Sequence, residues 1–133
     1  MGFSNGGSVT LRSAAFDPEF DMIGVFPRAF IMVYGGCHSE VNFNARDYNP
    51  ALLYIAGSED NLVKAETCLE RKNDTVSNDI DVMVIEGAYH MFDGNTSRTI
   101  NHPKWGKIKL RADSDATEKA RERVVRLLKR VFE

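Results

Sequence analysis

Three residues of this chain have the side chains needed for nucleophilic catalysis, and they occur in the order serine, aspartate, histidine. Ser4 lies within residues 2–6, whose sequence Gly-Phe-Ser-Asn-Gly fits the pattern Gly-x-Ser-x-Gly. In that motif a serine occupies a strained turn between a strand and a helix, and glycines flank it because a side chain there would collide with neighbouring backbone. Asp60 follows Gly57, and His90 follows Gly87.

The chemistry of these side chains suggests how they could share one reaction. A serine hydroxyl is a weak nucleophile at neutral pH and needs a base within hydrogen-bond reach. His90 would take that proton and later deliver it to a leaving group, while Asp60 would orient the imidazole and stabilise its charged form. Taken singly, Asp60 could be a turn residue, His90 an ordinary loop residue and Ser4 a helix cap. Their joint order favours a catalytic set.

The elements that would position these residues are short apolar runs and amphipathic stretches. Residues 29–34, 51–56 and 80–85 are almost continuously apolar, which is typical of strands buried on both faces. Apolar residues at helical spacing predict helices over 8–16, 62–71 and from Asp113 or Asp115 to about residue 131. Loops are predicted over 17–28 and 37–50, and irregular chain over 88–112.

This alternation of strands and helices predicts an α/β fold with about three parallel strands and flanking helices, in a single domain over residues 1–133. Loops that follow the strands of an open parallel sheet hold the ligand site. Asp60 and His90 both fall in such loops, so we expect them to approach hydrogen-bond distance. Ser4 is expected to be displaced, because no strand is visible before it.

Composition excludes several classes of function. The chain has 133 residues with 43% hydrophobic and 27% charged residues, and its net charge of −2 favours neither nucleic acid nor an anionic membrane. No apolar run is long enough to span a bilayer, and no signal peptide is visible, so a cytoplasmic location is predicted. The two cysteines, Cys37 and Cys68, make no disulfide framework and are interpreted as free thiols.

Other chemistry-bearing residues have simpler interpretations. Cys37 and His38 could join His90 or His102 around zinc, but this spacing fits no standard site, and no metal or cofactor is expected. Two glycosylation patterns, at 73–75 and 95–97, are short and occur often by chance. Trp105 could line a substrate mouth or pack its segment onto the sheet.

Three stretches, at residues 2–7, 56–60 and 87–93, resemble the C-terminal half of a dienelactone hydrolase-like α/β-hydrolase. The last, Gly-Ala-Tyr-His-Met-Phe-Asp, is the most specific, and the order Ser, Asp, His is the order of that triad. The resemblance implies Ser4 as nucleophile, Asp60 as triad acid, His90 as triad base and the backbone N–H of Asn5 as an oxyanion donor. It implies a serine hydrolase acting on small carboxylic esters or lactones, without metal or organic cofactor.

The sequence departs from that family in three respects. The namesake enzymes use a cysteine nucleophile, so Ser4 favours a general ester hydrolase over lactone specificity. Lys64 stands where the family often has proline, which is minor. The N-terminal half of the sheet, which supplies the second oxyanion donor and much of the substrate pocket in the family, has no counterpart in the sequence.

That last departure predicts how the molecule assembles. Without a preceding strand, residues 29–34 would form an unpaired, apolar edge. We therefore expect a homo-oligomer, or association with a missing N-terminal half. The alternative function is a catalytically inactive half-domain that acts only as a structural or oligomerisation module.

Overall fold

The structure is a computed structural model that describes residues 1–15, 24, 26–37, 50–74 and 80–133. Most of the two loops predicted over 17–28 and 37–50 lies outside the described residues, as does Phe16 at the end of the first predicted helix. No helix in the described part of the chain is long and apolar enough to cross a membrane.

A parallel sheet of four strands, in the order β1-β2-β3-β4, forms the centre of the molecule and confirms the α/β class. The strands are β1 (Gly2–Phe3), β2 (Ala29–Val33), β3 (Ala51–Gly57) and β4 (Ile80–Ile85). The last three lie within one residue of the predicted apolar runs. The apolar runs are continuous because helices cover both faces of the sheet.

The prediction that no strand precedes Ser4 is wrong. Gly2 pairs with Met32 and Phe3 with Val33, so β1 lies parallel to β2, and the Ser4 N–H donates to the Val33 carbonyl over 3.0 Å. Two residues suffice here because β2 is already held by its pairing with β3 and presents its other edge, to which the two residues of β1 can align. In the described part of the chain, β2 pairs on this side only through Met32 and Val33.

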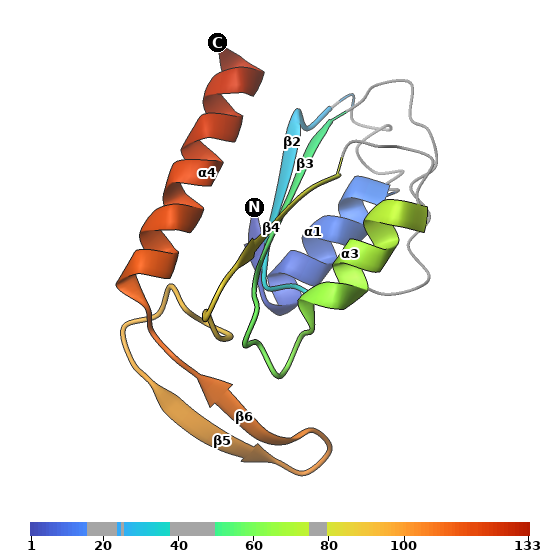
Figure 1. Ribbon diagram of the computed structural model, residues 1–133. Coiled ribbons are helices and arrows are strands. Elements are labelled where there is room, and N and C mark those ends of the chain that lie inside the picture. The colour runs from blue at the N-terminus through green and yellow to red at the C-terminus, as the bar shows by residue number, and fades with distance from the viewer. Residues whose placement is uncertain (16–23, 25, 38–49, 75–79) are drawn as a thin grey trace.

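In the described part of the chain, three helices cover the sheet: α1 (Asn5–Ala15) and α3 (Ala65–Asp74) lie on one face and α4 (Ser114–Phe132) on the other (Figure 1). Alternate residues of β2 and β3 point to opposite faces. One set packs with α1 and α3: Met32, Tyr54 and Ala56 with Leu11, Ala65 and Cys68. The other set packs with α4: Ile31, Val33, Leu53 and Ile55 with Ala116, Ala120 and Leu127. Asp113 caps α4, as one of the two predicted alternatives, by accepting the Ala116 N–H over 2.9 Å.

Residues 88–112 are not wholly irregular, which corrects the prediction for this stretch. They contain an antiparallel hairpin of β5 (Arg98–His102) and β6 (Gly106–Leu110). The hairpin lies outside the main sheet (Figure 1) and buries only Ile108 and Leu110 deeply, so its sequence lacks a clear apolar alternation. Trp105 at its turn is 57% exposed and stacks on His102 with ring centroids 4.1 Å apart, so it does not pack this segment onto the sheet.

The two cysteines form a disulfide, and their interpretation as free thiols is wrong. Cys37 follows β2 and Cys68 lies in α3, and the fold brings their Cα atoms to 5.2 Å, within the range that a disulfide bridges. Both side chains are buried in the core between the sheet and the helices α1 and α3. Their separation of 31 residues gave no sign of this contact in the sequence.

Candidate active site

Ser4 occupies a sharp turn between β1 and α1. Its φ of 49° lies in the left-handed region, where a residue with a side chain is strained. A Cβ atom at Gly2 would overlap the carbonyl group of Gly6, so the first glycine of the motif is required. A Cβ at Gly6 would meet no described atom within 4 Å, so the expectation that both flanking positions are crowded is wrong for Gly6.

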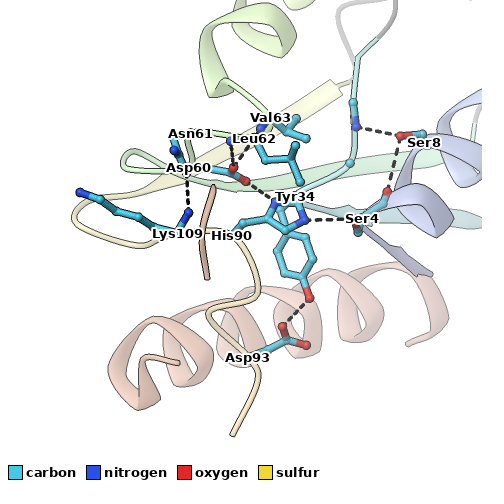
Figure 2. A network of polar contacts seen from close by, with 12 residues as sticks. Ser4, Ser8, Tyr34, Asp60, Asn61, Leu62, Val63, His90, Asp93 and Lys109 are labelled. Atoms are coloured by element: carbon cyan, nitrogen blue, oxygen red, sulfur yellow. Dashed lines mark hydrogen bonds and ion pairs between the residues drawn. The ribbon is translucent and has the colours of Figure 1, made fainter. Parts of the chain in front are cut away.

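The three predicted side chains lie in one hydrogen-bonded chain, shown in Figure 2. The Ser4 Oγ atom is 3.0 Å from Nε2 of His90, and Nδ1 of His90 is 2.7 Å from Oδ2 of Asp60. His90 and Asp60 thus lie within hydrogen-bond distance, as expected. The expected displacement of Ser4 is wrong, because its backbone is bonded to β2 through Val33.

Asp60 is buried, at 5% exposure, and backbone groups satisfy its second oxygen. The N–H groups of Leu62 and Val63 both donate to Oδ1 over 2.9 Å, which leaves Oδ2 for His90. An ionised carboxylate can only accept, so the Nδ1 of His90 carries the proton and its Nε2 is free to accept from the Ser4 hydroxyl. His90 itself is 2% exposed, so water competes little for either contact.

The parallel sheet explains how residues so distant in sequence meet. Ser4 directly follows β1, Asp60 lies three residues beyond β3 and His90 five beyond β4, all at the carboxyl end of the sheet. Asn5 is the first residue of α1. The first N–H groups of an α-helix have no carbonyl partner within the helix, so the Asn5 N–H can donate to an anionic oxygen near Ser4.

Sequence reasoning missed a fourth side chain at this end of the sheet. Tyr34 directly follows β2, and its ring centroid lies 4.7 Å from that of His90. Its hydroxyl donates to Oδ1 of Asp93. Burial, and then the hydrogen bond to Asp93, raise the pKa of Tyr34 well above its ordinary value. Its place after a buried strand, next to Gly35, was the signal that could have singled it out.

Asn61, beside Asp60, was also missed. Its Nδ2 donates to the Lys107 carbonyl over 2.6 Å, and its Oδ1 accepts the Lys109 N–H over 3.0 Å. Its side chain therefore pairs with the free edge of β6 much as a strand would. The N–H of Arg111 donates to the His90 carbonyl over 3.3 Å. The hairpin is thus tied to the loops of both Asp60 and His90.

The zinc hypothesis finds no support in the described residues. Cys37 is bonded to Cys68, and in this part of the chain no three His, Cys, Asp or Glu side chains gather where they could hold a metal ion. His38, one of the residues considered as a ligand, lies outside the described residues.

Comparison with known proteins agrees with this fold. The profile of the dienelactone hydrolase family matches residues 1–132. No curated protein sequence matches the chain.

Two solved structures are similar to it. One, described as a candidate dienelactone hydrolase from Klebsiella pneumoniae subsp. pneumoniae, is 18% identical with a TM-score of 0.60, over 94% of this chain and 48% of that one. The other is MGS-M1, an alpha/beta hydrolase enzyme from a Medee basin deep-sea metagenome library, which is 20% identical with a TM-score of 0.61, over 98% of this chain and 52% of that one. The chain thus spans about half the length of these structures and shares their fold.

Proposed function

Because the chain belongs to the dienelactone hydrolase family, we propose that it carries the catalytic residues of a serine hydrolase acting on carboxylic esters or lactones. The observation that supports this most is the continuous hydrogen-bonded chain from Ser4 through His90 to Asp60. A serine that is only a helix cap would not need a strained backbone, nor a histidine aimed at its hydroxyl.

The proposed reaction is acyl transfer to Ser4 followed by hydrolysis. As Ser4 Oγ bonds to the ester carbonyl carbon, His90 takes the hydroxyl proton at Nε2, and the Asn5 N–H donates to the developing oxyanion. The bond to the leaving alcohol then breaks, and His90 returns the proton to that alcohol. A water molecule, deprotonated by His90, then attacks the acyl carbon, the bond from that carbon to Ser4 Oγ breaks to release the acid, and His90 returns the proton to Ser4 Oγ. Asp60 stabilises the imidazolium in both steps.

The same proposal covers the substrate, the absence of a cofactor from the mechanism and the cellular location. A small ester or lactone is the proposed substrate, and the serine nucleophile favours esters over lactones. The mechanism uses neither a metal nor an organic cofactor. A cytoplasmic location also stays a prediction, and the Cys37–Cys68 disulfide, a bond typical of oxidising compartments, weighs against it.

A fluorophosphonate probe tests the nucleophile. The parent protein should be labelled, and Ser4→Ala should lose the label because the probe reacts only with an activated serine. Ser114→Ala is the matched control, since Ser114 is an exposed serine at the start of α4 and its loss should leave labelling unchanged. Labelling of Ser4→Ala at the parent level would contradict the assignment of the nucleophile.

A second candidate function rests on the length of the chain, which is about half that of the solved structures it resembles. On this view the chain is a catalytically inactive structural or oligomerisation module. Turnover of a nitrophenyl ester separates the two. Activity that falls by at least about 100-fold in His90→Ala, as loss of a general base requires, would exclude the inactive module.

A further inference from the structure

Tyr34 has a backbone conformation that its position in the sheet does not require. It follows β2 directly, its N–H continues the β2–β3 pairing by donating to the Ile55 carbonyl over 2.7 Å, and yet its φ is 39°. A tyrosine rarely adopts a left-handed φ, because its Cβ atom then crowds the backbone. Such strain persists only where surrounding contacts hold it, and it is concentrated at functional sites.

The contacts of Tyr34 reach two points on the turn that carries His90. Its ring lies against the imidazole with an interplanar angle of 58°, and it meets the edge of the Phe92 ring at 5.4 Å. Its hydroxyl donates to Asp93, three residues beyond His90 (Figure 2). One buried side chain, directly after β2, thus contacts both the imidazole and the far end of its turn.

His90 needs support of this kind. Its two ring nitrogens must reach Asp60 and Ser4 at once, yet the turn around it is irregular, with Met91 at a φ of 59°. The backbone of this turn is held by the hydrogen bond from Arg111, by Asp113 donating to the Phe92 carbonyl over 2.8 Å and by Gly94 donating to the Met91 carbonyl over 3.0 Å. These backbone hydrogen bonds fix the main chain of the turn but do not restrain the side-chain torsion angles of His90.

We propose that Tyr34 is a positioning residue for His90: its ring fixes the plane of the imidazole, and its hydroxyl, through Asp93, fixes the turn. This rests on the proposed function of His90 as a general base. Because its pKa is raised, Tyr34 keeps its proton and stays a donor to Asp93 while His90 exchanges protons. A small rotation of the imidazole would lengthen the Nε2 contact to Ser4, and displacements of about 1 Å can cost about 100-fold in rate.

Kinetics of paired variants test this proposal. Tyr34→Phe removes the hydroxyl and keeps the ring, and it should lower kcat about 10-fold, the range found for supporting contacts, with little change in KM. Asp93→Ala should match it, and the double variant should be no worse than either single, because both break the same bond. Asp93→Asn keeps an accepting oxygen and should restore most of the lost kcat. Asp93 is exposed, so its two substitutions spare the core.

Tyr54→Phe is the matched control. Tyr54 is also buried, and its hydroxyl donates to the Gly35 carbonyl over 3.0 Å rather than to the turn that carries His90. It should lower stability and leave kcat within about twofold, since its hydroxyl bonds to neither His90 nor Asp93. Equal kcat losses in Tyr34→Phe and Tyr54→Phe would show a general effect of buried hydroxyls and would overturn the proposal.

A readout without turnover separates this inference from the proposed function. The Nδ1 proton of a histidine bonded to a carboxylate gives a low-field proton NMR signal. That signal should be sharp in the parent and in Tyr54→Phe, and weakened by exchange with water in Tyr34→Leu, which removes the ring. If the signal and kcat both survive in Tyr34→Leu, Tyr34 does not position His90. If the signal depends on Tyr34 but the parent hydrolyses no ester, the positioning role stands and the proposed function fails.

Discussion

Tyr54 illustrates how a single buried side chain links the sheet to the pH dependence of stability. It lies in β3 at 1% exposure, and its hydroxyl is bonded to the Gly35 carbonyl. Burial, with smaller contributions from the charges of Asp60 and Glu66, raises the pKa of Tyr54 above its ordinary value of 10.0. The folded protein therefore keeps this phenol protonated at a pH where the unfolded chain loses the proton.

The stability contributed by such a group is complete below pH 10 and decreases as the pH rises above it. We expect the free energy of unfolding of the parent to fall above about pH 10, with Tyr54 contributing about 1.4 kcal/mol per pH unit. Tyr54→Phe should be less stable near neutral pH but should show a shallower fall. Urea unfolding between pH 8 and pH 11 measures both, and parallel curves for parent and variant would contradict this expectation.

At the level of elements, buried strands were predictable and the hairpin was not. Residues 29–34 and 51–56 are apolar on both faces because helices cover both faces, and residues 80–85 depart from this only at Asp81, which pairs with Arg123 of α4, so composition alone predicted all three strands. β1 has only two residues, too few for any periodicity, and β5 is exposed along almost its whole length. β5 and β6 are held by backbone pairing and by the side chain of Asn61, and neither leaves a hydrophobic pattern in the sequence.

Asn61 gives a testable consequence for this hairpin. Asn61→Ala removes both side-chain bonds to β6, each worth about 1 kcal/mol. We expect amide exchange at Lys109 to accelerate about 10-fold or more, which corresponds to about 1.4 kcal/mol. Asn101→Ala, at an exposed position on β5, is the control and should leave exchange at Lys109 unchanged. Equal exchange in both variants would mean that Asn61 does not anchor the hairpin.

For the candidate site, the sequence indicated the residues but not their supports. Gly-x-Ser-x-Gly and the strand-end positions of Asp60 and His90 were visible, because they depend on local motifs and on the rule for parallel sheets. Tyr34 was overlooked as a site residue because its role depends on a ring contact and a hydroxyl bond between two strand ends. The Cys37–Cys68 pairing depends in the same way on where β2 and α3 meet.

At the level of the whole molecule, self-association stays a prediction. β1 pairs with β2 only at Met32 and Val33, so the stretch from Ala29 to Ile31 has no strand partner on that side among the described residues. Phe30 and Ile31 are apolar and packed against the helices, so this edge offers unpaired backbone beside apolar side chains and is suited to pairing with another chain. A homodimer or higher oligomer should therefore appear in ultracentrifugation at micromolar concentration. A monomer that unfolds in one cooperative transition would show that this edge needs no cover.

The disulfide places the three residues of the candidate site in different covalent segments of the chain. Cys37 and Cys68 close a covalent ring across a separation of 31 residues; Asp60 lies inside the ring, and Ser4 and His90 lie outside it, on opposite sides. A single peptide-bond cleavage between Cys37 and Cys68 would open this ring without separating the piece that carries Ser4 from the piece that carries His90. A nicked chain would therefore migrate as one species on a non-reducing gel and as two after reduction.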